Sequence, residues 1–229
     1  MVSDSPVKPD PNLWLPQLNL YIRDREIIFN DRWLTDSIIC AAQALLRDQS
    51  EGKINGWMST QLCKRRELFP PVPRSSPFIQ ILHVDGCHWI TVSNIDILNG
   101  SQRSDSVMIY DSSTPARIPL AVKRAVCSIM QPPTDIIHFD LVNVHPQLNS
   151  NDCGLYAVAF ATELVHGRDP SLCHFNTSAM RQHLVGCLNE GHLSCFPLKK
   201  RRRIPLGSKV KKSVQEHIYC TCRTINDKM

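Results

Sequence analysis

Residues 147–154 read Gln-Leu-Asn-Ser-Asn-Asp-Cys-Gly, and the apolar run Leu155–Ala161 follows at once. This change from polar to apolar residues predicts a helix that begins at Cys153. A cysteine at the start of a helix faces the positive end of the helix dipole, which favours the thiolate over the thiol. Gln147, six residues upstream, offers a side-chain amide that a loop can fold back over the same sulfur. A thiolate and an amide donor are two of the parts that acyl transfer requires.

A cysteine nucleophile also needs a base, and a third group that holds this base in the correct tautomer. His88 opens a predicted strand directly after the turn signal Asp85-Gly86. Asp111 ends another predicted strand, just before a polar Ser-Ser-Thr sequence. If the two strands are neighbours, both side chains emerge at one rim of the sheet, where the helix that begins at Cys153 can dock.

Each of these residues also has a simpler interpretation. Cys153 by itself fits a buried structural thiol, and Asp111 fits a turn cap. His88 competes with the other histidines, of which His83 and His138 lie within strand patterns. We favour the catalytic interpretation because a helix-start cysteine, an amide donor and an imidazole that needs an orienting group occur together.

The remaining apolar patterns predict an α+β fold, since a helix is followed by several strands and then by helices. The first helix has apolar residues at helical spacing and follows Thr35 or Asp36, either of which can cap it. Gly167 is expected to end the helix that begins at Cys153. The predicted strands are 78–84, 88–93, 107–111 and 135–142, and the predicted helices are 38–46, 120–130, 153–166 and 178–188.

The net charge of +5 is an uneven average. Eight Lys and Arg residues lie between Leu198 and Lys212, whereas the chain through Pro197 carries 16 basic and 19 acidic side chains. A mildly acidic body is not suited to gripping phosphate backbones. The basic run, 199–212, lacks the interleaved aromatic residues of a nucleic-acid platform. We therefore interpret it as a nuclear-import signal bound by import factors, with a solvated linker as the simpler alternative.

The ten cysteines do not indicate a disulfide framework. The segment Met1–Pro11 is polar and Pro-rich, without the apolar core of a secretory signal. No apolar stretch approaches the ~20 residues that a membrane span requires. Most of the cysteines lie in apolar patterns, where a reduced cysteine packs as a small hydrophobe. These features predict a reducing, intracellular location, and the basic run favours the nucleus over the cytoplasm.

The chain resembles a known family, the ubiquitin-like-protein proteases related to the SUMO proteases and the adenovirus protease. The resemblance rests on His88-Trp89, Tyr110-Asp111-Ser112, Gln147 and Asn-Asp-Cys153-Gly, taken in that order. An N-terminal motif, Trp33-Leu34-x-Asp36-x-x-Ile39, matches as well. The likeness covers about residues 20–188, and its order of His, Asp, Gln and Cys is the reverse of the papain order.

The resemblance implies a fold and a set of roles. The fold is that of a cysteine protease, with a central mixed or antiparallel sheet flanked by helices and the nucleophile at a helix N-terminus. Cys153 would attack a C-terminal Gly carbonyl, and His88 would act first as base and then as acid. Asp111 would orient His88, while Gln147 and the Cys153 backbone N–H would stabilise the oxyanion.

The resemblance also implies substrate-binding roles for Trp33, Asp36 and Trp89. The two tryptophans would wall a narrow slot that admits only residues without a Cβ, which would select a Gly-Gly tail. Both tryptophans are equally compatible with ordinary core packing. No cofactor is expected, and the protein is expected to be a monomer.

The C-terminus carries a short cysteine motif. The sequence from Tyr219 to Arg223, Tyr-Cys-Thr-Cys-Arg, resembles the opening of a PHD zinc finger, but the chain ends seven residues after Cys222. A structural zinc site needs four N or S ligands, so no metal site is expected. The predicted organisation is an extended segment 1–17, a catalytic domain 18–197, a basic linker 198–217 and a truncated PHD-like stub 218–229.

The leading hypothesis is a cysteine peptidase or isopeptidase that cleaves after the C-terminal Gly-Gly of a ubiquitin-like modifier. Two alternatives stay open at this point. One is a catalytically idle modifier-binding module tethered to chromatin, and the other is a viral or transposon-type protease that cuts Gly-containing peptides. The sequence does not distinguish between modifiers, or between precursor processing and deconjugation.

Overall fold

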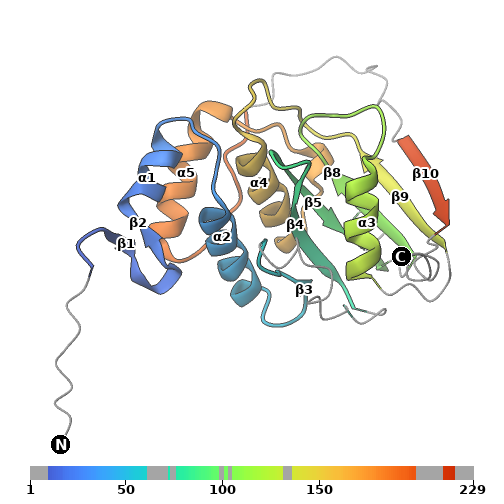
Figure 1. The fold of residues 1–229 in the computed structure, drawn as a ribbon, viewed down its shortest axis with the longest axis horizontal. Coiled ribbons are helices and arrows are strands. Elements are labelled where there is room, and N and C mark those ends of the chain that lie inside the picture. The colour runs from blue at the N-terminus through green and yellow to red at the C-terminus, as the bar shows by residue number, and fades with distance from the viewer. Residues whose placement is uncertain are drawn as a thin grey trace, which may run out of the picture.

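A computed structural model describes residues 10–60, 72, 76–97, 101–102, 105–130, 136–199 and 214–219. The framework is a six-stranded mixed sheet in the order β10-β9-β8-β5-β4-β3. Helices cover this sheet, as Figure 1 shows. The central strands are β4 (Phe78–Val84), β5 (His88–Ser93), β8 (Ser106–Tyr110) and β9 (Ile136–Val142), flanked by β3 (Asn55–Gly56) and β10 (Val214–Tyr219). The predicted α+β fold with a mixed sheet is confirmed.

The direction of each strand follows from its connection. A tight turn joins β4 to β5, so these strands pair antiparallel, with Val84 opposite His88. Strand β8 pairs antiparallel with β5, and β9 pairs parallel with β8. The parallel pair needs a crossover, which α3 (Leu120–Ile129) supplies. The turn predicted at Asp85-Gly86 is present, with both residues at positive φ.

Two apolar clusters lie on opposite faces of the sheet because side chains alternate along each strand. Ile90, Val92, Val107 and Ile109 pack with the apolar face of α3. The larger cluster contains Ile79, Ile81, Trp89, Met108 and Tyr110 from the sheet. Its other members come from α2 (Asp36–Gln49), α4 (Cys153–Val165) and α5 (Thr177–Glu190).

Helix α4 lies at the centre of this larger cluster. Its residues Cys153–Leu164 are all buried, which explains why the sequence is apolar around the whole helix rather than along one stripe. The helix ends where predicted, with Gly167 at φ +68° just beyond it. Thr35 is the residue that caps α2, accepting a hydrogen bond from the Ile38 N–H at 3.5 Å.

Several elements were not predicted from the sequence. The N-terminal part of the chain forms the pair β1 (Leu13–Leu15) and β2 (Leu20–Tyr21), a 3₁₀ turn (Pro16–Leu18) and helix α1 (Ile22–Phe29). The long connection between β5 and β8 contains the small hairpin β6 (Ile95–Asp96) and β7 (Ser101–Gln102). A second 3₁₀ turn, Pro170–Leu172, precedes α5.

Strand β10 was also not predicted. It extends the sheet by antiparallel pairing with β9 and spans the predicted boundary at residue 217 between linker and stub. The rest of the basic run from Lys200 onward and the Cys220–Cys222 motif lie outside the described residues.

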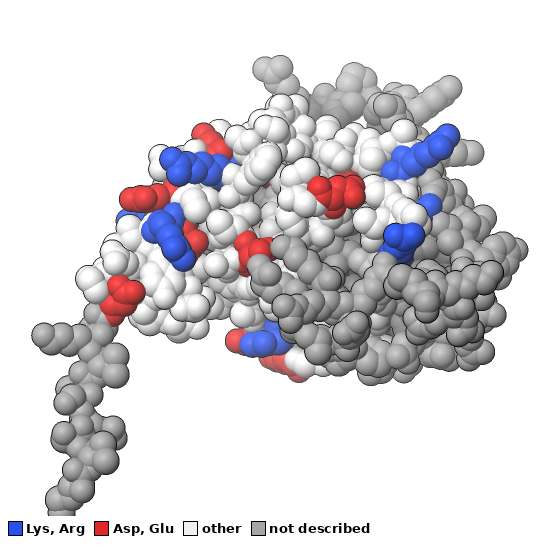
Figure 2. All heavy atoms as spheres, in the orientation of Figure 1, with Lys and Arg blue, Asp and Glu red and all other residues white. Residues whose placement is uncertain are grey.

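The described surface has no dominant charge on the face drawn in Figure 2, where basic and acidic side chains are interspersed. No helix among the described residues is long and apolar enough to span a membrane.

Candidate active site

The topology brings His88 and Asp111 to one rim of the sheet. Strand β5 begins at His88, and β8 ends at Tyr110, the residue before Asp111. Since β5 and β8 are antiparallel neighbours, the start of one and the end of the other lie at the same edge. The His88 Nε2 atom lies 2.7 Å from Asp111 Oδ1, within hydrogen-bonding distance.

Asp111 is held in place by more than the imidazole. It is only 3% exposed, and its Oδ1 also accepts hydrogen bonds from the Ser113 N–H and the Ser113 hydroxyl, both at 2.8 Å. The polar residues after β8 therefore do cap a turn, as the simpler interpretation expected. The same oxygen nevertheless contacts His88, so turn capping and orientation of an imidazole are compatible.

The environment of His88 favours its protonated form. Partial burial opposes the charge, but hydrogen bonds with Asp111 and Cys153 and the negative charges of both groups outweigh burial. Together they raise the pKa of His88 to about 10. Because Nε2 contacts Asp111, Nδ1 is the nitrogen that remains for Cys153. The structure thus brings together the three side chains that the sequence predicted as nucleophile, base and orienter.

Cys153 is the first residue of α4, and its side chain is almost completely buried. The N-terminus of the helix approaches the sheet closely because the next residue is Gly154. A Cβ at this position would lie 3.0 Å from Leu34 Cβ and 3.1 Å from Trp89 Cδ1. Further along α4, the Thr91 hydroxyl of β5 donates to the Ala157 carbonyl at 2.7 Å. These contacts fix the distance between the sulfur and the rim of the sheet.

Gln147 is linked to the segment that follows Asp111. Its backbone N–H donates to the Ser112 carbonyl at 2.9 Å, and the Ser112 hydroxyl donates to Gln147 Oε1 at 2.6 Å. Its amide nitrogen donates to the Asn149 carbonyl at 2.5 Å. An amide carries two N–H groups, so this bond leaves one donor for a ligand. The role of Ser112 was not predicted, although this residue belongs to the Tyr-Asp-Ser motif.

The loop between Gln147 and Cys153, called the active-site loop below, is held by its own side chains. Asn149 Oδ1 accepts from the N–H groups of Asn151 and Asp152 at 3.1 and 3.0 Å, and its Nδ2 donates to Asp152 Oδ2 at 2.9 Å. The Trp33 indole N–H donates to the Ser150 carbonyl at 2.7 Å. These bonds give the loop a defined path into α4.

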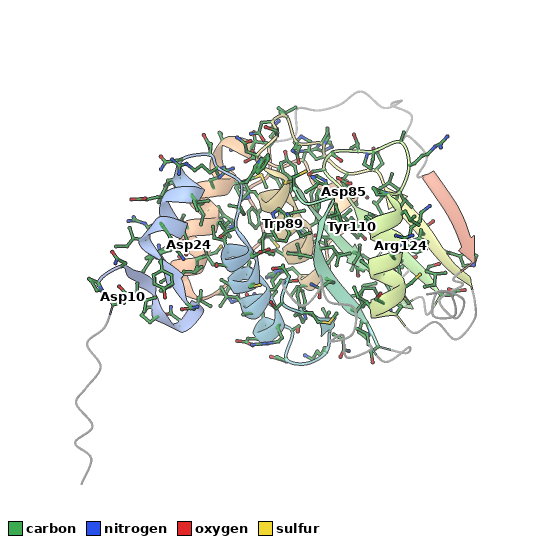
Figure 3. The ribbon with its side chains drawn as sticks, viewed as in Figure 1. Asp10, Asp24, Asp85, Trp89, Tyr110 and Arg124 are labelled. Atoms are coloured by element: carbon green, nitrogen blue, oxygen red, sulfur yellow. The ribbon has the colours of Figure 1, made fainter. Side chains whose placement is uncertain are left out.

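The three predicted substrate-binding residues have different surroundings. Trp33 is half exposed and contacts the active-site loop. Trp89 is 4% exposed, donates to the Leu34 carbonyl at 3.1 Å, and lies near the centre of the molecule in Figure 3. Asp36, at the start of α2, accepts from the Thr60 hydroxyl at 2.9 Å. Of the two tryptophans, only Trp33 is accessible to a ligand in this structure.

No cluster of potential metal ligands occurs among the described residues. The described cysteines are all free thiols: Cys40, Cys87, Cys127, Cys153, Cys173, Cys187 and Cys195.

Comparison with known proteins identifies the family. Residues 77–190, which contain His88, Asp111, Gln147 and Cys153, match the Ulp1 protease family, C-terminal catalytic domain. The chain is a member of the Ulp1 protease family. It is therefore a cysteine protease. No curated protein matches the sequence.

Solved structures share the Ulp1 fold at low identity. The C-terminal Ulp1 protease domain in complex with Smt3, the yeast ortholog of SUMO, superposes with a TM-score of 0.58 at 13% identity, covering 79% of this chain and 87% of that chain. The Ulp1-like SUMO protease catalytic domain of Chaetomium thermophilum gives a TM-score of 0.58 at 16% identity, covering 81% and 85%. A structure of the SUMO protease Ulp1 with its catalytic cysteine oxidized to a sulfinic acid gives 0.56 at 14% identity, covering 79% and 88%.

The close packing at Gly154 predicts a position-specific effect of adding one methyl group. Gly154→Ala should destabilise the protein by about 1–3 kcal/mol, because the new Cβ would clash with Leu34 and Trp89. It should also lower the rate at which the protease turns over substrate, because the sulfur would move with the helix. Chemical denaturation and single-turnover kinetics measure the two effects.

Gly186→Ala is the matched control. Gly186 lies inside α5, and a Cβ there would meet nothing within 4 Å. This variant should be stabilised by roughly 0.5–1 kcal/mol, since alanine is the better helix former. Equal effects of the two substitutions would contradict the account of the α4 docking.

The raised pKa of His88 predicts a pH effect when its carboxylate partner is removed. In Asp111→Asn the pKa of His88 should fall towards its ordinary value, because the amide carries no charge to stabilise the imidazolium. As the pH rises, the imidazolium of the variant would then lose its proton at a lower pH than that of the wild type. The alkaline limb of kcat/KM should move from near pH 10 to lower pH, and kcat/KM at neutral pH should fall about 100-fold or more. An alkaline limb that does not move would argue against the contact.

Proposed function

We propose that the chain is a peptidase or isopeptidase that cleaves after the C-terminal Gly-Gly of a ubiquitin-like modifier. Cys153, His88, Asp111 and Gln147 carry the reaction in this proposal. The observation that supports it most is the contact of His88 with both Asp111 and Cys153 at the start of α4. A random buried cysteine has no reason to face an imidazole that a buried carboxylate orients.

The first half of the reaction forms an acyl-enzyme. The Cys153 sulfur attacks the carbonyl carbon of the terminal glycine, and the carbonyl oxygen becomes an oxyanion. The Cys153 backbone N–H at the start of α4 and the Gln147 amide are the donors proposed for this oxyanion. The imidazolium of His88 then gives its proton to the leaving amine, and a thioester to Cys153 remains.

The second half releases the modifier. His88, now neutral, takes a proton from a water molecule, which attacks the thioester carbonyl. The sulfur leaves as a thiolate beside the imidazolium, so the resting ion pair is restored. Asp111 keeps the ring oriented through both halves by accepting a hydrogen bond from the Nε2–H of His88, while Nδ1 gives and takes the proton.

The burial of Cys153 restricts which substrates can react. The side chain is 1% exposed, so only a thin, extended segment can bring a carbonyl to the sulfur. Two consecutive glycines are the thinnest peptide segment available because they lack a Cβ. Trp33, half exposed and bonded to the active-site loop, is the proposed substrate contact at the surface. Trp89 is buried, so its proposed role is to support the start of α4 by packing against Gly154.

A modifier is the proposed source of this glycine tail because of the similar structures. One of them is a Ulp1 protease domain in complex with Smt3, and another is a Ulp1-like SUMO protease catalytic domain. SUMO is therefore the first modifier to test, and ubiquitin and other modifiers with a Gly-Gly terminus belong in the same panel.

The test is covalent capture by modifiers that carry an electrophile in place of the C-terminal carboxylate. One modifier should form an adduct on Cys153, and Cys153→Ala should abolish it. Cys87→Ala is the matched control, because Cys87 is an exposed thiol one residue before His88 and should not affect capture. Gln147→Ala should slow capture about 100-fold through loss of one oxyanion donor.

Other outcomes would favour a different function. Adducts that survive Cys153→Ala would contradict the assigned nucleophile. Cleavage of Gly-containing peptides without capture of any modifier would indicate a peptide-directed protease. Tight, non-covalent binding of a modifier that is unaffected by His88→Ala, without turnover, would indicate a binding module.

A further inference from the structure

A buried ion pair lies next to the nucleophile, outside the groups assigned to the reaction. Arg181, on α5, is 8% exposed, and Asp152, the residue before Cys153, is 7% exposed. Arg181 Nε and Nη2 donate to the same oxygen, Asp152 Oδ1, at 3.1 and 2.5 Å. These two charge-assisted bonds hold one carboxylate oxygen, and the Asn149 amide donates to the other, Oδ2, at 2.9 Å, so the carboxylate has a defined position and orientation.

The rest of the guanidinium holds the segment after α1. Its Nη1 donates to the carbonyls of Ile28 and Arg32, each at 3.0 Å. Nε also lies 3.1 Å from an oxygen of Asp31, whose side chain is 79% exposed. One arginine therefore connects α5, the end of α1 and the loop that enters α4. The same loop carries the Ser150 carbonyl that Trp33 contacts.

The location of Asp152 makes its charge relevant to catalysis. A carboxylate beside a reacting sulfur disfavours the thiolate by charge repulsion unless a cation neutralises it. Asp152 already influences Tyr156, one turn into α4: burial first, and then the charge of Asp152, raises the pKa of Tyr156 to about 12. The negative charge thus reaches the first turn of the helix that carries Cys153.

We propose that Arg181 is a positioning residue of the protease. It neutralises Asp152 so that the Cys153 thiolate can form beside His88, and it holds the loop that begins at Gln147 and that Trp33 contacts through Ser150. The proposal rests on the assignment of Cys153 as the nucleophile. The titratable or charged groups on the elements packed around this loop are His88 and Asp111 at the rim of the sheet, Asp31 after α1, Asp152 before α4, Tyr156 in α4, His145 bonded to Tyr156, and Arg181 in α5.

A purely structural role for Arg181 makes a different prediction. In that case the important contacts are the bonds to the Ile28 and Arg32 carbonyls, and the charge of Asp152 does not matter. Removing Asp152's charge would then leave the defect of an Arg181 variant unchanged. If Arg181 acts through Asp152, removing both charges should restore the thiolate.

The experiment measures how pH controls alkylation of Cys153 by iodoacetamide, followed at this residue by mass spectrometry in the full chain. Arg181→Met should move the pH midpoint of alkylation upward by about one unit, which is a tenfold slower reaction on the rising limb. Arg181→Met combined with Asp152→Asn should return the midpoint to within a few tenths of a unit of wild type. A midpoint that does not move in the single variant, or that stays raised in the double variant, overturns the proposal.

Arg168→Met is the matched control, at an arginine just beyond the C-terminal end of α4. Arg168 Nε lies 2.9 Å from an oxygen of Glu163, which is completely buried in α4. Glu163 is ten residues after Cys153, about 15 Å along the helix. This variant also leaves a buried carboxylate unpaired, so it should lower stability but leave the alkylation midpoint of Cys153 unchanged. A shift equal to that of Arg181→Met would mean that the effect is general destabilisation.

Two further measurements separate the possible failures. If Arg181→Met does not fold, Arg181→Lys keeps the charge and loses the paired geometry. Arg181→Lys should keep the wild-type alkylation midpoint, and a raised midpoint overturns the proposal. Its kcat should fall more than its KM rises, because the loop before α4 is held less well. Alkylation needs no modifier, so failure of modifier capture with the expected midpoints would reject only the proposed substrate.

Discussion

The site depends on one hydrogen bond across the ends of two antiparallel strands, between His88 Nε2 and Asp111 Oδ1. Burying a carboxylate is costly unless hydrogen bonds and a cation compensate it. Ser113 supplies two of the bonds, and the imidazolium supplies the cation. The ring therefore has one stable orientation, with its second nitrogen towards Cys153. If Asp111 were displaced, the protonation of His88 and the stabilisation of the thiolate would both be lost.

The second requirement is the close docking of α4 against the sheet. Gly154 permits the approach, Trp89 and Leu34 form the surface that it meets, and Thr91 anchors the next turn. The loop before α4 is held from three sides, by Ser112 through Gln147, by Trp33 through Ser150, and by Arg181 through Asp152. Each of these residues comes from a different part of the chain, so the position of the nucleophile depends on the packing of the whole domain.

Local chemistry explains what could be predicted from the sequence. The Asp85-Gly86 turn, the alternating strands on both sides of it and the apolar run after Cys153 have signals that do not depend on the rest of the fold. The pairing of β5 with β8 then places His88 beside Asp111. Helix α1 could not be predicted in the same way, because its pattern is only weakly amphipathic and its stability comes from packing against α5. Strand β10 follows the basic run, and its sequence, Val-Gln-Glu-His-Ile-Tyr, lacks the regular apolar-polar alternation that would predict a strand; its pairing with β9 extends the edge of the sheet.

The roles of single residues divide along the same line. Cys153 and His88 could be proposed because each lies at the start of a predicted element. Arg181 lies inside a predicted helix, and no sequence motif distinguishes it from other polar residues. Its partner Asp152 is 29 residues away in sequence, and only the folded chain shows the contact. Trp33 and Trp89 looked equivalent in the sequence, yet one is a half-exposed surface residue and the other lies in the core.

The protonation state of His88 tests the account most directly. The ¹³C and ¹H shifts of its ring, assigned by comparison with His88→Gln, can be followed by NMR from pH 5 to pH 11. The account predicts that the ring stays protonated through neutral pH and titrates near pH 10, as the contacts with Asp111 and Cys153 require. A ring that titrates near the ordinary value of about 6.5 would contradict the buried contact on which the site depends.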